Sequence, residues 1–184
     1  MVAPPPRVFT VGHGTRTADD LVAVLRDAGV TVVVDVRRYP GSRRHPQFGR
    51  DALAATLPAA GIGYEWQGEA LGGRRSRSPN SRHTALRNPA FAGYADHMDT
   101  PGFREAVDAL VARAAAGDRP AVMCAETLWW RCHRRLIADA LVLRGAGVTH
   151  LIGVGDSQAH PPHPDMHTGP DGWPVYGPPP LPGL

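Results

Sequence analysis

The sequence predicts a single α/β domain, built as a three-layer sandwich around a mostly parallel sheet of about five strands. Short apolar runs with β-branched residues alternate with longer segments whose apolar residues recur at helical spacing. This alternation is typical of right-handed βαβ units. The run TVVVDVR at 31–37 is almost continuously apolar, as in a strand covered on both faces. With 184 residues, the chain suits one domain with a hydrophobic core of its own.

The first third of the chain is expected to supply three strands and two helices. VFTVGH (8–13) is the first strand, because it is short, apolar and ended by glycine. The next helix is expected to begin after Thr17, which forms a capping box with Asp20 three residues later, and to end at Gly29. The remaining elements here are a strand at 31–37, a helix at 51–61 and a shorter strand at 61–66.

The middle and the end of the chain are less regular. Residues 67–89 hold five arginines without apolar periodicity, so we expect a mobile arginine-rich loop. From residue 156 the chain is rich in Pro, Gly and His, and we expect a segment packed on the domain of residues 1–155 or trailing from it. This tail is expected to be solvated, histidines included, with at most a hairpin around 173–176. Between loop and tail we expect helices at 90–98 and 101–117, a strand at 120–126, a helix from about Trp130 and a strand at 148–154.

Composition narrows the classes of protein to which the chain can belong. A hydrophobic content of 42% with 20% charged residues is ordinary for a globular domain. All 20 basic residues are arginines, which favour bidentate contacts with phosphate or carboxylate, but a net charge of +3 does not by itself indicate nucleic acid. Residues 1–7 form a proline-rich lead-in rather than a signal peptide, and no apolar run reaches the length of a membrane helix. We therefore expect a cytoplasmic protein without a membrane partner, whose two cysteines are reduced.

Polar side chains follow four of the predicted strands at their carboxyl ends, where open α/β sheets bind ligands. They are His13 after the first, Asp35 and Arg37 in the second, Tyr64 in the third, and Cys124 and Glu126 in the fourth. Each has a structural explanation of its own, such as a turn cap, an ion pair between loops or a small buried thiol. Their convergence on one rim nevertheless favours a functional crevice.

The segment MCAETLWWRCHRR (123–135) concentrates this chemistry. With a helix starting near Trp130, His133 shares the buried face of that helix and overlooks the rim. Arginines in a first helical turn oppose the positive end of the helix dipole, so an anionic partner is expected: a substrate phosphate, or Glu126 and Asp35. Alternatively, Arg135 pairs with Asp139 one turn later. One of the two tryptophans is expected in the core.

Several separated motifs, in this order, resemble the family known as domain of unknown function 488 (DUF488). They are VGHGTR, DVRRYPGSRRHPQF, EALGG, AFAGYADHM and MCAE…WWRCHRRLIAD. The arginine-rich loop at 74–87 departs from that pattern, which leaves substrate specificity open. The resemblance implies a compact intracellular bacterial α/β domain that acts as an enzyme, without a settled reaction.

The first functional hypothesis is an enzyme, a hydrolase or transferase, acting on a phosphate-bearing substrate such as a nucleotide or nucleic acid. Glycosidic-bond chemistry is one form that it could take, and we expect no cofactor and no bound metal. The reactive groups are expected among the carboxylate, imidazole and thiol side chains Glu126, Asp35, His13, His133 and Cys124. Substrate contacts are expected from Arg37, Arg43, Arg44, Arg131, Gln47 and the aromatic residues Tyr64, Trp129 and Trp130.

Three alternatives remain open. Cys124 ahead of Arg131 loosely resembles the cysteine–arginine loop of rhodaneses and cysteine phosphatases, although glycine is missing and Glu126 stands inside it. A zinc site from Cys124, Cys132 and His133, with His13 as fourth ligand, has suitable donor softness but unsuitable spacing. A non-catalytic nucleic-acid-binding module would use the 74–87 loop and the 37–50 segment to contact phosphates.

Overall fold

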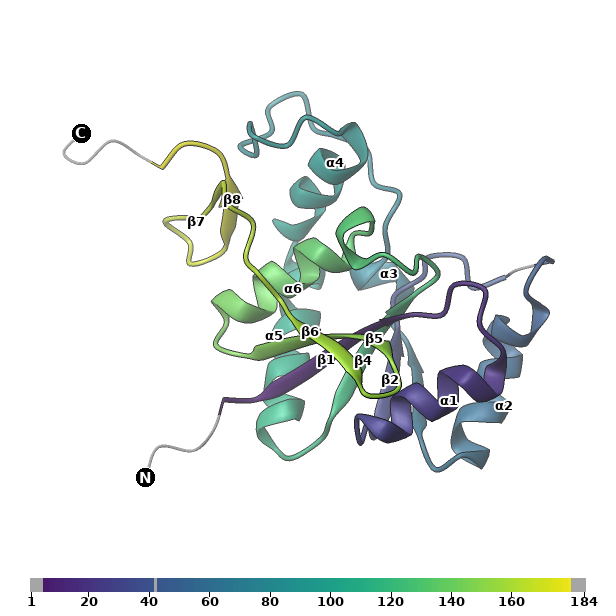
Figure 1. Cartoon of the computed structure of the whole chain (residues 1–184). Helices are drawn as coiled ribbons and strands as arrows, with labels where there is room; N and C mark the ends of the chain where they lie inside the picture. Colours follow the sequence, from purple (N-terminus) through teal and green to yellow (C-terminus); the bar gives the residue numbers. More distant parts are fainter. Residues whose placement is uncertain (1–4, 42, 180–184) are drawn as a thin grey trace.

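The computed structural model describes residues 5–41 and 43–179 (Figure 1). The start of the proline-rich lead-in (1–4), Ser42 of the arginine-rich motif and the end of the tail (180–184) lie outside the described residues. Among the described residues, no helix combines the length and apolar character that crossing a membrane requires.

A six-stranded sheet in the order β3-β2-β4-β1-β5-β6 forms the middle layer. The first five strands in the chain pair in parallel and β6 pairs antiparallel with β5. This architecture confirms the predicted fold class and adds one strand at the edge. The strands are β1 (Arg7–Gly12), β2 (Val32–Asp35), β3 (Gly63–Trp66), β4 (Pro120–Cys124), β5 (Gly147–Gly153) and β6 (Asp156–Ala159).

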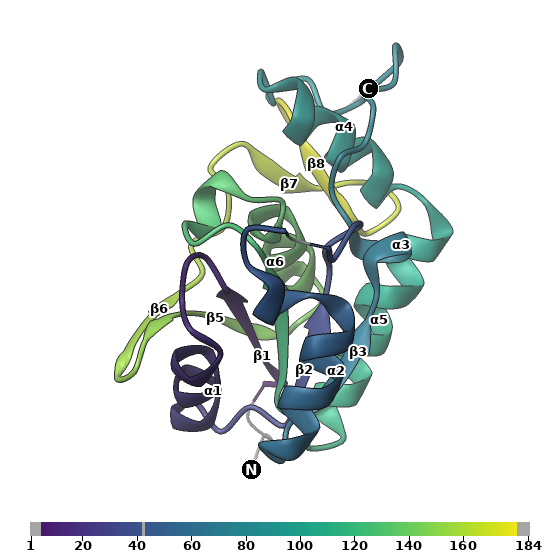
Figure 2. The ribbon, with the colours of Figure 1, turned by 90° about the vertical axis from the view of Figure 1, so that its right-hand side faces the viewer.

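Helices cover both faces of the sheet, which gives the three layers (Figures 1 and 2). One core packs α1 and α2 against the sheet and a second core packs α4, α5 and α6 against the opposite face. Successive strand residues alternate between these cores: Val33 joins the first and Val34 the second. The helices are α1 (Ala18–Asp27), α2 (Arg50–Ala59), α3 (Gly68–Leu71), α4 (Pro89–Met98), α5 (Pro101–Ala115) and α6 (Arg134–Leu143).

The helix predicted from about Trp130 begins later than expected. A 3₁₀ turn at Trp129–Arg131 comes first, and α6 starts at Arg134 with His133 as its N-cap residue. Arg131 and Cys132 therefore precede the helix rather than occupying its first turn. The predicted loop at 67–89 also contains the short helix α3, whose Leu71 is fully buried.

The tail is more structured than expected. A tight turn, in which Gly155 has φ +68°, connects β5 to β6, and β6 extends the sheet. All four residues of β6 are exposed, so its sequence shows no alternation of apolar and polar residues. β7 (Met166–Thr168) and β8 (Pro174–Tyr176) pair as a separate hairpin that lies beside α6 (Figure 1). Tyr176 is fully buried in the core on that side, so the hairpin is anchored to the domain.

Candidate functional site

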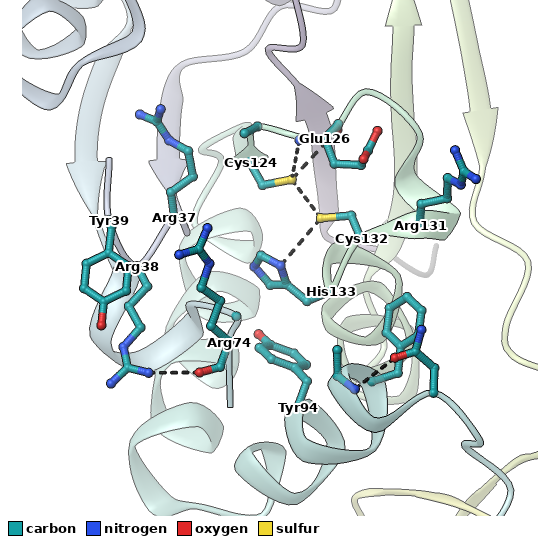
Figure 3. Close-up of a pocket in the computed structure, with 15 residues that line it drawn as sticks. Arg37, Arg38, Tyr39, Arg74, Tyr94, Cys124, Glu126, Arg131, Cys132 and His133 are labelled. Carbon is teal, nitrogen blue, oxygen red and sulfur yellow. Dashed lines mark hydrogen bonds between the residues drawn. The ribbon is translucent and has the colours of Figure 1, made fainter. Parts of the chain in front are cut away.

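A cavity of about 370 Å³ opens beyond the carboxyl ends of β2 and β4 (Figure 3). Five of the predicted site residues line it: Arg37, Cys124, Glu126, Arg131 and His133. The other eight, namely His13, Asp35, Tyr64, Gln47, Arg43, Arg44, Trp129 and Trp130, lie outside its wall. In Figure 3, Arg37, Arg38 and Arg74 stand on one side, Glu126 and Arg131 stand on the other, and Cys124, Cys132 and His133 lie between.

Two thiols form the centre of this cavity. Cys124 is the last residue of β4 and Cys132 comes two residues before α6; both are free and buried. Their sulfur atoms are 2.7 Å apart, so one thiol donates a hydrogen bond to the other. The sulfur of Cys132 also accepts from the backbone N–H of Arg134 at 3.5 Å and lies 3.6 Å from His133 Nδ1. Cys132 is thus surrounded by groups that favour its thiolate.

The surroundings shift the pKa values of the two thiols in opposite directions. Burial and the hydrogen bond with Cys132 raise the pKa of Cys124 well above its ordinary value. Burial opposes ionisation of Cys132 too, but the bond from Cys124 and the neighbouring His133 and Arg134 hold the pKa of Cys132 well below its ordinary value. The pair therefore gives up its first proton readily and keeps the second.

Arg134 supplies the positive charge beneath the thiols. Its side chain is only 1% exposed, and it donates to the carbonyl oxygens of Glu126 and Thr127 and, at 3.3 Å, to Thr10 Oγ1. None of the ion pairs among the described residues 5–41 and 43–179 includes Arg134. Gly12 makes this approach possible, because a β-carbon there would collide with the Glu126 carbonyl and stand 2.9 Å from Arg134 Nη2.

A buried hydrogen-bond chain continues from Arg134 into the tail. Thr10 Oγ1 accepts from the Arg134 guanidinium, which can only donate, and lies 2.6 Å from His150 Nδ1. His150 Nε2 and His160 Nδ1 share a hydrogen bond of 2.9 Å, and His160 Nε2 donates to the carboxylate oxygen Oδ1 of Asp139 at 2.8 Å. The hydrogen-bond chain thus joins the buried guanidinium of Arg134 to the buried carboxylate of Asp139.

This hydrogen-bond chain overturns two expectations from the sequence. His160, expected in a solvated tail, is only 8% exposed and is a member of the hydrogen-bond chain. Asp139, the alternative partner of Arg135, instead accepts from His160, from the backbone N–H of His163 and from the hydroxyl of Tyr176. The tail is therefore fixed to α6 by a buried carboxylate.

A second polar cluster adjoins the cavity through Arg37. Both oxygens of the fully buried Asp35 accept from the Arg37 guanidinium, at 2.9 and 2.6 Å, and Tyr64 donates to Oδ2 at 2.8 Å. Arg37 Nη1 also reaches His13 Nε2 at 3.2 Å. Burial lowers the pKa of His13 to about 4, against the opposing effect of its hydrogen bond to Gly14. This cluster is an ion pair between strand ends, with a neutral imidazole beside it.

The groups on the wall are more open. Glu126 is exposed; its carboxylate accepts from the Leu128 N–H at 3.2 Å and turns away from the two sulfurs in Figure 3. Arg131 is exposed and no acceptor is found for it among the described residues, while Arg74 stands 5.9 Å from the ring centre of the exposed Tyr39. Both guanidinium groups are available to an anionic ligand.

The model for the domain of unknown function DUF488 matches residues 17–141, more than half of the chain. The chain belongs to the DUF488 family. The matched segment carries both thiols, Arg134 and Asp139, whereas His150 and His160 follow it. No curated protein and no solved structure matches the chain.

The zinc hypothesis finds no support in the geometry of this DUF488 site. Across residues 5–41 and 43–179, no group of three His, Cys, Asp or Glu side chains is arranged to hold a metal ion. His13, the suggested fourth ligand, lies outside the cavity and is engaged by Arg37 and Gly14.

Three residues that line the cavity were not expected at the site from the sequence: Cys132 as a reactive group, and Arg74 and Tyr94 in the wall. Arg134, the buried cation next to Cys132, was not expected there either. The position of Cys132 could have indicated its role, because a thiol just before the start of a helix lies close to free backbone N–H groups. The helix was predicted to start near Trp130, which placed Cys132 inside the helix rather than before it. Trp129 is confirmed as the core tryptophan; its ring stacks on His150 at 4.1 Å. Trp130 is 45% exposed.

Proposed function

We propose that this DUF488 protein is an enzyme that acts on a phosphate-bearing substrate, such as a nucleotide, and that the Cys132 thiolate is its nucleophile. The observation that carries the proposal is the position of the Cys132 sulfur in the cavity. It accepts from the Cys124 thiol at 2.7 Å and from the Arg134 N–H at 3.5 Å, beside His133. These groups favour a charged sulfur facing the space where a ligand would lie.

The carboxylates are weaker candidates for this role. Both oxygens of Asp35 are occupied by Arg37 and Tyr64, and Asp35 is fully buried outside the cavity wall. Glu126 is exposed on the wall and turns away from the sulfurs, so it suits the role of a base that accepts a proton from water better than attack. The thiol hypothesis thereby moves ahead of carboxylate chemistry, with Cys132 in the place that the sequence suggested for Cys124.

In the proposed reaction, Cys132 attacks phosphorus. A bond from Sγ to phosphorus forms while the bond from phosphorus to the leaving oxygen breaks, and that oxygen takes a proton from water. A second water, which gives its proton to the Glu126 carboxylate, then attacks phosphorus; the bond from Sγ to phosphorus breaks, inorganic phosphate leaves and the thiolate is restored. Arg74 and Arg131, which hold their guanidinium groups at the wall, would bind the phosphate oxygens.

Turnover of a panel of nucleotides and phosphate monoesters tests the proposal. We expect phosphate release by the wild type and by Glu126→Gln at a reduced rate, and none by Cys132→Ser with an unchanged thermal melt. Full activity in Cys132→Ser would exclude the thiolate mechanism, and loss only in Glu126→Gln would restore the carboxylate mechanism.

A second candidate is a non-catalytic nucleic-acid-binding module. It is favoured by the exposed Trp130, which precedes the exposed Arg131 of the cavity wall, since an aromatic ring and a guanidinium together suit a stacked base and its phosphate. Arg43 and Arg44 add exposed charge in the 37–50 segment. Binding of single-stranded oligonucleotides that weakens steeply with salt supports this function, and absence of binding at low salt excludes it.

A further inference from the structure

The two thiols are placed for covalent bonding to each other. Their sulfur atoms, 2.7 Å apart, need to approach by less than about 1 Å to reach the ~2.05 Å of a disulfide bond. The close approach comes from the fold, because β4 ends at Cys124 and the chain returns through the 3₁₀ turn to place Cys132 in front of α6.

The surroundings of the two sulfurs differ in a way that assigns them different roles. Cys132 meets the N-terminal end of α6 and the imidazole of His133. Cys124 closes β4 and accepts from the backbone N–H of Glu126 at 3.3 Å, which would stabilise negative charge that develops on it later. Both sulfurs line the cavity and both lie near the buried charge of Arg134.

We propose that Cys132 and Cys124 form a redox-active dithiol that reduces low-molecular-weight disulfides, with Cys132 as the attacking sulfur and Cys124 as the resolving sulfur. This activity goes beyond phosphate chemistry and rests on the proposed function only in taking Cys132 as the thiolate.

The Cys132 thiolate attacks one sulfur of a disulfide R–S–S–R, a protein–S–S–R bond forms, and one thiolate RS⁻ leaves and takes a proton from solvent. Cys124 then attacks Cys132 Sγ, the intramolecular disulfide forms, and the second RS⁻ leaves with the proton of Cys124. Two electrons pass from the dithiol to the substrate, giving one protein disulfide and two RSH.

The cavity also selects the charge of the substrate. Arg38, Arg74 and Arg131 line the wall, and within residues 5–41 and 43–179 the exposed Arg74 and Arg131 form no ion pair with a carboxylate. Guanidinium groups attract anions, so a disulfide that carries carboxylates or phosphates is expected to react faster than a cationic one.

The test uses the dianionic disulfide 5,5′-dithiobis(2-nitrobenzoate), in a small excess over the reduced full-length protein. Wild-type protein is expected to release two equivalents of thionitrobenzoate and to retain none, with mass spectrometry locating a Cys124–Cys132 cross-link. Cys124→Ser is expected to release one equivalent and retain one. Cys132→Ser is expected to react at least about 10-fold more slowly, because its remaining thiol is buried and protonated.

Each contrary outcome overturns a different statement. Wild-type protein that retains the label without forming the cross-link contradicts the dithiol activity, and this stoichiometry requires no variant to fold. Cross-linking by a protein that turns over no phosphate substrate contradicts the proposed function but leaves the dithiol in place. Equal rates with oxidised glutathione and with the cationic disulfide cystamine contradict the selection of anions.

Discussion

Removing the carboxylate of Asp139 is predicted to destabilise the fold and to release the tail. Asp139 is fully buried and accepts from His160 Nε2 at 2.8 Å, from the Tyr176 hydroxyl at 2.9 Å and from the His163 N–H at 3.0 Å. Asp139→Ala leaves these three donors without an acceptor, at about 1–3 kcal/mol each, and such losses add incompletely within one network. We therefore expect the free energy of unfolding to fall by about 3–5 kcal/mol, in the range for a broken buried charge network.

Urea denaturation followed by circular dichroism measures this loss, and limited proteolysis shows whether cleavage concentrates between residues 156 and 179. Asp108→Asn is the matched control, because Asp108 makes a 2.8 Å ion pair with Arg144 at the surface. Exposed pairs contribute about 0–1 kcal/mol, so this control is expected to stay close to the wild type. A loss below about 1 kcal/mol in Asp139→Ala would refute the assignment of the carboxylate as the anchor of the tail.

Three further predictions concern charge at and near the site. Burial holds the pKa of His13 at about 4 and that of His150 at about 3, below their unfolded value of 6.5. The unfolded chain therefore binds more protons than the folded chain below pH 6.5, and the free energy of unfolding decreases as the pH is lowered, by up to about 1.4 kcal/mol per pH unit for each group. His150→Gln is expected to flatten this slope between pH 6.5 and 4 in urea titrations. Arg74→Ala is expected to weaken binding of a nucleotide about 10-fold by calorimetry, and unchanged affinity would remove Arg74 from the anion site. Cys132→Ser is expected to lower phosphate release by at least about 100-fold, whereas a loss below 10-fold would speak against a covalent role.

Much of the fold follows from local signals in the sequence. The Thr17–Asp20 capping box forms, with Asp20 N–H donating to Thr17 Oγ1 at 3.0 Å. The apolar run at 31–37 becomes the buried β2, and polar residues do gather at the carboxyl ends of the strands. These features depend on neighbours in the chain, which is why periodicity and capping chemistry reveal them.

The remaining features depend on contacts between distant segments. β6 consists of exposed polar residues, and it is a strand because it pairs with β5. His160 belongs to a Pro-, Gly- and His-rich segment that looks solvated in the sequence. In the structure its ring is buried because it forms hydrogen bonds with Asp139 and His150. Cys132 differs from an ordinary helical cysteine because α6 begins only at Arg134, and no local signal fixed that boundary.

The split of the four strand ends has the same origin. Alternation along a strand sends Asp35 to one face of the sheet and Cys124, on the neighbouring strand, to the other. Asp35 and His13 therefore meet at Arg37, while Cys124 contacts Cys132 in the lining of the cavity. The strand ends at one edge of the sheet therefore form two separate sites, one on each face. Which face a residue joins follows from the register in which its strand pairs with the neighbouring strand.

The most direct test of the central claim is the pH dependence of thiolate absorbance at 240 nm, taken as the difference between wild-type protein and Cys132→Ser. The surroundings of Cys132 hold its pKa well below the ordinary value, so the difference signal is predicted to persist well below the pH of about 8.5 at which an unperturbed cysteine ionises. A difference signal that appears only above about pH 8.5, where an unperturbed cysteine ionises, would contradict the account of Cys132 as the nucleophile of this cavity.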